Sequence, residues 1–302
     1  MKHPINPTIL ILIFFVLSQI TGLGLLAADI TTVVDEVTGQ TTVEYSETIG
    51  GPRPQTTGAG SFAFLALGVG IGTALLLVLV KFRLHRFWKL WYFVAVWMAM
   101  AIAIGAITPV YVAVGAALLL AALKIFRSNM LIHNITEVLV YTGIAFLIVP
   151  IFDVFWVSVL LVVIAIYDAI AVWKSKHMIS LAQFQTESKL FAGLQIPYSD
   201  QATTKTVTKK PTEKKKRVNT AILGGGDIAF PLLFSGAVLQ WTVGLGYSSA
   251  QAFLLTLIIT ATTTISLAAL FWAAKKDHFY PAMPPLAAGC FAGLAIVALI
   301  VL

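Results

Sequence analysis

The sequence predicts an all-α fold, a polytopic bundle of nine transmembrane helices. Nine apolar runs each have about the length of a membrane span, for which roughly 20 residues are needed. The composition agrees, since 59% of the 302 residues are hydrophobic and 11% are charged, whereas soluble domains carry roughly 25% charged residues. Basic residues are also confined to alternate loops. These observations exclude a water-soluble fold.

The expected spans follow one another with short connections, except around one long loop. They cover residues 8–28, 61–81, 88–107, 109–124, 131–150, 152–173, 221–241, 252–274 and 281–302. The first run has an alternative interpretation, a signal peptide cleaved near Ala28. We favour a retained helix, because the run is longer than a usual signal core. The Thr-rich segment 29–60 is expected to form either a short hairpin or no regular structure.

This pattern divides the chain into three parts. Residues 1–173 form an amino-terminal six-helix part, residues 174–220 a basic cytoplasmic linker, and residues 221–302 a carboxyl-terminal three-helix part. The linker ends in a Lys-rich run, residues 205–217, and this run is expected to be solvated and disordered. Attraction to anionic lipid headgroups is a further expectation for such a run. The sequence leaves open whether the protein cleaves its own linker.

The loop charges predict the orientation of the chain. All but one of the 20 Lys and Arg residues lie on one set of alternate loops, and the exception is Arg53. Because basic loops stay in the cytoplasm, the amino terminus is expected to be cytoplasmic and the carboxyl terminus external. The basic residues thus serve topology, so the net charge of +7 does not indicate a nucleic-acid partner.

Two aspartates lie inside predicted spans, where an ionisable side chain costs roughly 3 kcal/mol or more. Asp227 follows three consecutive glycines, and Asp168 lies near the end of the preceding span. Both are expected roughly 8–9 Å from the cytoplasmic face at the helical rise of 1.5 Å per residue. Asp227 alone could be a polar residue in helix packing, but its matched depth with Asp168 favours a pair.

A buried carboxyl pair has a defined chemistry. The two groups cannot both ionise cheaply, so the pair shares one proton. The ionised member can take a proton from water while the protonated member polarises a carbonyl, which is the requirement for peptide hydrolysis. Tyr167, beside Asp168, is expected to hydrogen-bond near it, and the glycines before Asp227 allow close backbone approach.

A proline-rich segment opens the ninth span. Pro281, Pro284 and Pro285 lie within five residues, and we expect them to prevent a regular helix and leave an extended edge. Irregular backbone at membrane depth is tolerated where it lines a cavity. One proline alone would be compatible with an ordinary helix start.

The three motifs described above resemble those of a known family, the intramembrane aspartyl proteases, which comprise presenilin and signal peptide peptidase. The YD, GxGD and PAL motifs match Tyr167-Asp168, Gly224-Gly225-Gly226-Asp227 and Pro281-Ala282-Met283-Pro284. Their order and span positions match over the whole chain. The departure is Met283 where the family has leucine, a volume-conserving change. The cytoplasmic amino terminus is similar to presenilin, and the simple loops indicate a prokaryotic homologue.

The resemblance implies a presenilin-like fold and cleavage of peptide bonds within transmembrane helices. It implies that Asp168 and Asp227 are the catalytic pair and that the substrate-binding residues are Tyr167, Gly224, Gly225, Gly226, Pro281, Ala282, Met283 and Pro284. No cofactor or metal is expected. The implied partners are transmembrane proteins or signal peptides together with membrane lipid, and the sequence is compatible with a homo-oligomer.

Other chemistries find less support. The chain has no HExxH motif for zinc, no GxSG motif for a serine nucleophile, and a single cysteine, Cys290, which forms no disulfide within the chain. Glu137 is interpreted as a partner of Lys124 or Arg127 or as a snorkelling residue.

The alternative function is a transporter or cation channel with the Asp pair as a relay, for which the Thr-rich eighth run is suitable. No inverted repeat of broken helices supports it. A scaffold without chemistry is disfavoured by the paired acids.

Overall fold

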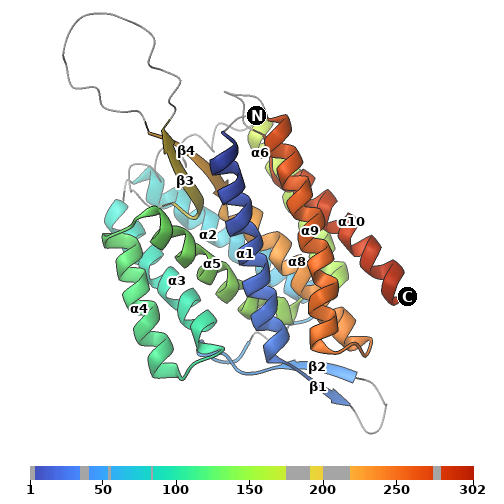
Figure 1. The fold of residues 1–302 in the computed structure, drawn as a ribbon. Coiled ribbons are helices and arrows are strands. Elements are labelled where there is room, and N and C mark those ends of the chain that lie inside the picture. The colour runs from blue at the N-terminus through green and yellow to red at the C-terminus, as the bar shows by residue number, and fades with distance from the viewer. Residues whose placement is uncertain are drawn as a thin grey trace, which may run out of the picture.

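The protein is a bundle of long apolar helices with a small β-hairpin at each end (Figure 1). The structure is a computed structural model that describes residues 4–34, 41–53, 56–82, 84–174, 191–199, 218–274 and 280–302. Most of the basic linker, including its Lys-rich run, lies outside these described residues.

Nine α-helices form in the described ranges. They are α1 (Ile5–Asp29), α2 (Ala59–Lys81), α3 (His85–Gly105), α4 (Val110–Phe126), α5 (Met130–Ile148), α6 (Val154–Lys174), α8 (Gly225–Gly244), α9 (Ser249–Ala273) and α10 (Met283–Val301). Eight of them are long and apolar enough to span a membrane, with α5 extended by a 3-10 turn, Val149–Ile151. The exception is α4, whose 17 residues span about 26 Å at the helical rise. The prediction of a helical, multi-pass membrane protein is confirmed.

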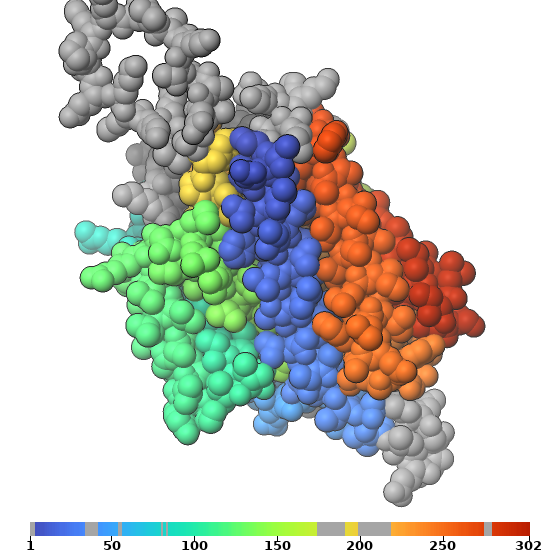
Figure 2. Space-filling model, in the orientation of Figure 1, coloured from blue at the N-terminus to red at the C-terminus, as the bar shows by residue number. Residues whose placement is uncertain are grey.

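The centre of the bundle is formed by α5 and α8. In each of them 67% of the spanning residues are buried, against 6% in α2. Along one face of the molecule α1 lies between α5 and α9 and also contacts α8 (Figure 2). Helix α6, which carries Asp168, packs against α8 and α10. The two candidate carboxyls are therefore carried by neighbouring helices.

The segment after α1 forms a hairpin, which decides between the two alternatives left by the sequence. Strands β1 (Ile30–Val34) and β2 (Thr41–Tyr45) pair antiparallel, with Ile30 opposite Tyr45. Nearby, Arg53 donates to the carbonyl oxygens of Ser46 and Phe146 and lies 3.9 Å from Asp29. The basic residue that departs from the loop pattern is thus matched by an acidic neighbour.

A second hairpin lies at the opposite end of the bundle (Figure 1). Strands β3 (Gly193–Ser199) and β4 (Val218–Gly224) pair antiparallel, with Gly193 opposite Gly224. This corrects one expectation, since the seventh span begins at Gly225 and not at residue 221. Residues 193–199 and 218–220 of the predicted linker form strands. The Lys-rich run of the linker, which is the part expected to be disordered, lies outside the described residues. Leu194, Ile196 and Leu223 are almost fully buried, so apolar burial stabilises the hairpin against the helices.

Close packing fixes α10 against α9. A Cβ at Gly289 would lie 2.8 Å from the Cα of Thr263, and one at Gly293 would lie 2.6 Å from the Cα of Ile259. Two glycines four residues apart therefore let the two backbones approach, as small residues do in membrane bundles. Helix α10 also packs against α6.

Candidate active site

Asp227 lies in the first turn of α8, as its third residue. Gly224 is the residue before the helix, with extended backbone angles of φ −64° and ψ 151°. The sequence predicted helix from residue 221, and this was wrong because three glycines are poor residues in a helix interior. At the helix start their cost is small, since the first N–H groups have no intrahelical partner.

The glycines bring backbone and side chains close to Asp227. A Cβ at Gly224 would lie 3.1 Å from Asp227 Oδ2, and one at Gly225 would lie 2.5 Å from the Tyr141 hydroxyl oxygen. The backbone N–H of Gly225 donates to the carbonyl of Ala192 just before β3, at 3.2 Å. The start of α8 is thus held by α5 on one side and by β3 on the other.

Pro231 interrupts the hydrogen bonding of α8 one turn after Asp227. Proline has no N–H to donate to the carbonyl four residues earlier, which is that of Asp227. From α1, the buried side chain of Gln19 donates from Nε2 to the carbonyl of Ile228 at 3.0 Å. Gln19 was not predicted as part of the site, although an amide side chain within the apolar run 8–28 is recognisable from the sequence.

Asp168 projects from α6 toward the start of α10. Its Oδ2 accepts a hydrogen bond from the backbone N–H of Met283 at 3.0 Å, and the backbone of Ala282 also faces it. Asp168 and Asp227 lie close enough for their charges to interact. The structure therefore brings together the two aspartates and the Ala282–Met283 backbone from three separate parts of the chain.

Tyr167 does not join this group. Its side chain is 66% exposed on the surface of the bundle, since consecutive helical residues point in different directions. The expected hydrogen bond near Asp168 is not found for Tyr167 among the described contacts.

The proline-rich segment is more regular than the sequence predicted. Helix α10 begins at Met283, so Pro284 and Pro285 lie within its first turn and only Pro281 and Ala282 precede it. The expectation that all three prolines prevent a helix was wrong, because the first turn needs no N–H donors and tolerates proline. The irregular edge is therefore short.

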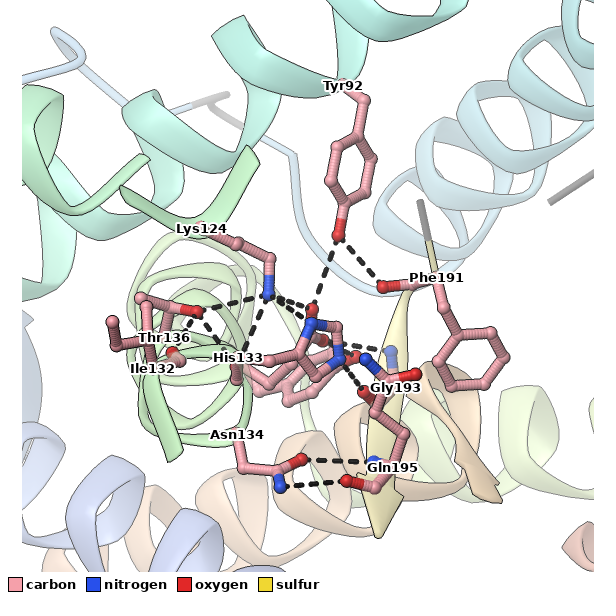
Figure 3. A network of polar contacts seen from close by, with 11 residues as sticks. Tyr92, Lys124, Ile132, His133, Asn134, Thr136, Phe191, Gly193 and Gln195 are labelled. Carbon is pink, nitrogen blue, oxygen red and sulfur yellow. Dashed lines mark hydrogen bonds and ion pairs between the residues drawn. The ribbon is translucent and has the colours of Figure 1, made fainter. Parts of the chain in front are cut away.

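Glu137 is the centre of a buried polar network that the sequence predicted only in part. Figure 3 labels Tyr92, Lys124, His133 and Gly193, which surround it. Its Oε1 lies 2.7 Å from Lys124 Nζ, which confirms the pairing with Lys124. Lys124 was expected in a loop but lies in the last turn of α4 and is 3% exposed. We call Tyr92, Lys124, His133, Glu137 and Tyr141 the Glu137 network; all five are buried. Within the described residues, no three His, Cys, Asp or Glu side chains group as a metal site.

Comparison with known proteins places this chain in a family. A family model described as signal-peptide peptidase, presenilin aspartyl protease matches residues 52–302, and the chain therefore belongs to this family of intramembrane aspartic peptidases. No curated protein sequence matches the chain.

Two solved structures of presenilin family intramembrane aspartate proteases share the fold. The first, in space group C222, has a TM-score of 0.61 at 20% identity and covers 97% of this chain and 99% of that one. The second, in space group P2, has a TM-score of 0.59 at 21% identity and covers 96% of each chain. The helical arrangement described above is thus shared along nearly the whole chain.

Proposed function

We propose that Asp168 and Asp227 are the catalytic pair of this intramembrane aspartyl endopeptidase, which hydrolyses peptide bonds within transmembrane helices. The observation that carries the proposal is the placement of two half-buried aspartates on helices that pack against each other. Asp168 on α6 is hydrogen-bonded to the start of α10, and Asp227 lies in the first turn of α8. Ion pairing does not account for either carboxyl, since the salt bridges of the described residues are Arg53–Asp29 and Lys124–Glu137.

The chemistry divides between the two carboxyls. The ionised member removes a proton from a water molecule as the oxygen attacks the scissile carbonyl carbon. The protonated member donates its proton to the carbonyl oxygen. As the tetrahedral intermediate collapses, the carboxyl that took the water proton donates it to the leaving nitrogen, and the other carboxylate takes a proton from a hydroxyl of the intermediate. The C–N bond breaks, the products are an acid and an amine, and the pair is again singly protonated.

The backbone around the pair supports a substrate-binding role for the neighbouring motif residues. Gly224 has no side chain, and a Cβ there would lie 3.1 Å from Asp227 Oδ2, so its absence lets a substrate backbone approach that carboxyl. Pro281 and Ala282 precede α10 beside Asp168. A substrate helix must be unwound for hydrolysis, and its freed backbone groups need partners within the membrane. The short extended segment at Pro281–Ala282 is our candidate for one of those partners.

The orientation and the lipid contacts belong to the same proposal. The alternate distribution of basic residues supports a cytoplasmic amino terminus, and Lys81 and Arg127 at helix ends are suited to anionic headgroups. For a transporter, no observation in the described structure supplies a pathway beyond the Asp pair itself.

A direct cleavage assay tests the function. Purified protein in lipid bicelles is incubated with a synthetic peptide that forms one membrane-spanning helix, and the products are mapped by mass spectrometry. We expect cuts within the spanning segment, and faster cuts when glycines flank the site because the helix unwinds more easily. Cleavage confined to exposed ends of the peptide would contradict the proposal.

A further inference from the structure

The Glu137 network contains a buried ion pair that the proposed catalytic chemistry does not use. Glu137 is 1% exposed and Lys124 3% exposed. Such a pair is costly to bury unless its hydrogen-bonding groups are satisfied. Here Lys124 Nζ donates to Thr136 Oγ1 at 3.1 Å and to the carbonyl of His133 at 3.3 Å, besides its contact with Glu137. The pair is therefore complete on the lysine side.

The carboxylate of Glu137 connects three other elements. Its Oε2 accepts the backbone N–H of Gly193 in β3 at 3.0 Å and the hydroxyl of Tyr141 one helical turn along α5. Its Oε1 accepts the hydroxyl of Tyr92 from α3 at 3.3 Å. The Glu137 side chain, carried by α5, thus links β3 to α3 and α4.

Side chains of α5 form hydrogen bonds with the backbone at the edge of β3 that does not pair with β4. His133 Nε2 lies 2.8 Å from the carbonyl of Gly193 and must donate to it, because a carbonyl only accepts. The Asn134 amide both donates to the Gln195 carbonyl and accepts its N–H, each at 3.0 Å. Alternate residues of a strand direct their backbone groups to the same edge. Gly193 and Gln195 therefore bond α5 at one edge of β3, and the opposite edge pairs with β4.

Two contacts connect the Glu137 network to the backbone next to Asp227. Strand β3 pairs with β4, which ends at Gly224 and leads into α8. Tyr141, held by Glu137, touches Gly225 so closely that a Cβ there would lie 2.5 Å from its hydroxyl oxygen. The chain on both sides of Gly224 is therefore fixed by groups that Glu137 holds.

We propose that Glu137 is a positioning residue of the catalytic centre, which fixes Asp227 against Asp168 through the β3–β4 hairpin and through Tyr141. The proposal rests on the assignment of the two aspartates as the catalytic pair. Since a misplacement of about 1 Å can cost about 100-fold in rate, a loosened hairpin slows the chemical step and leaves binding of the substrate helix largely unaffected.

Two double variants test this role without leaving a buried charge unpaired. Lys124→Met/Glu137→Gln keeps a carbonyl oxygen that accepts the Gly193 N–H, whereas Lys124→Met/Glu137→Leu does not. The two variants are matched in charge and close in side-chain volume. We expect kcat of the Leu variant to be at least about tenfold below that of the Gln variant, whereas the KM values of the two variants should agree within about threefold.

Two readouts separate positioning from loss of folded protein. The titratable groups that face Asp227 in the described structure are Asp168 from α6 and Tyr141 from α5, so a displaced Asp227 changes the spacing of the two limbs of the pH–rate profile. A smaller folded fraction would only scale that profile. Hydrogen exchange of residues 191–199 and 218–226 should be faster in the Leu variant.

Thr242→Val is the matched control for general destabilisation. Thr242 is buried at the far end of α8 and bonds only carbonyls of its own helix, so its pH profile should keep the wild-type shape. Equal kcat and equal profiles in the two double variants would overturn the proposal.

If the Leu double variant does not fold, Asn134→Leu provides the test of whether the anchored hairpin positions Asp227. It releases β3 at Gln195 and leaves the ion pair intact, and unchanged kcat, profile and exchange there would also overturn the proposal. Faster exchange with unchanged kcat would show that the hairpin does not position Asp227. An active Asp227→Asn variant would instead count against the proposed function and leave the exchange result standing.

Discussion

The backbone N–H of Met283 donates a hydrogen bond to Asp168 Oδ2 at 3.0 Å. This donor is available because Met283 is the first residue of α10, where N–H groups have no intrahelical acceptor. Asp227 lies in the first turn of α8. Each carboxyl of the proposed pair therefore lies at the positive end of a helix dipole, although the two residues are carried by different helices.

Replacement of either aspartate by asparagine should remove the acid–base pair and leave the fold intact. We expect Asp168→Asn and Asp227→Asn each to lower the cleavage rate by at least about 1,000-fold, within the range that general acid–base catalysis contributes. Neither carboxyl forms a salt bridge in the described structure, so thermal unfolding should stay within a few degrees of the wild type. Substantial turnover by either purified variant would refute the assignment.

The pH–rate profile should be bell-shaped. Below the first macroscopic pKa of the pair both carboxyls are protonated and no base remains. Above the second both are ionised and no acid remains, so the rate falls on both sides. The measurement is kcat for the model peptide between pH 4 and pH 9, with the folded fraction checked at each pH. A flat profile over this range would contradict the shared-proton mechanism.

Gly225→Ala should reduce activity because its Cβ has no room. The added methyl would lie 2.5 Å from the Tyr141 hydroxyl oxygen and 3.1 Å from its ring, which forces α8 or Tyr141 to shift. We expect a loss of at least about tenfold in kcat, since small displacements near reacting groups are costly. Gly244→Ala, in open space at the other end of α8, is the matched control. Equal kcat in the two variants would show that the close approach at Gly225 has no catalytic consequence.

The helices and the order of the proposed site could be predicted from the sequence because membranes impose simple rules. Span length and loop charge located all nine helices, with starts that differ by at most four residues from those observed. The spacing of Asp168 and Asp227 along consecutive spans then placed both near one face. These are local signals that need no knowledge of packing.

The remainder depends on contacts between distant residues. Local sequence does not show that Gly193 pairs with Gly224, because the register is set by burial of Leu194 and Leu223 and by the side chains of α5. The start of α8 was misplaced for the same reason, since residues 221–224 are apolar enough for a helix but are drawn into β4. For Glu137 the sequence offered Lys124 or Arg127 as a partner, and the structure selects Lys124. Nothing in the local sequence indicates its hydrogen bond to Gly193.

The orientation of the chain is tested by reporters at both ends. We expect a tag before Met1 to be cytoplasmic and a tag after Leu302 to be external, because the basic loops stay inside. Alkaline phosphatase and green fluorescent protein fusions report the two sides in bacterial cells. Reversal of both reporters would overturn the orientation, and a reversed carboxyl terminus alone would require an even number of spans.

The prolines at the start of α10 should be required for cleavage of a helical substrate. Pro281 precedes the helix and Pro284 lies in its first turn. Alanine at both positions would let α10 extend backwards, since alanine is the best helix former and proline the worst. The Met283 N–H would then bond to a carbonyl of its own helix and leave Asp168 Oδ2. The short extended segment before α10 would be lost at the same time.

We therefore expect Pro281→Ala/Pro284→Ala to lower kcat for an unmodified helical peptide by at least about tenfold, because a charge-assisted hydrogen bond to Asp168 is removed. Pro285→Ala is the control, because it leaves the residues before Met283 unchanged. A peptide loosened by glycines near its cut site should regain part of the rate if the segment also helps to hold unwound substrate. Loss that is equal for both peptides would assign the effect to Asp168 alone, and full activity of the double variant on the helical peptide would reject both roles.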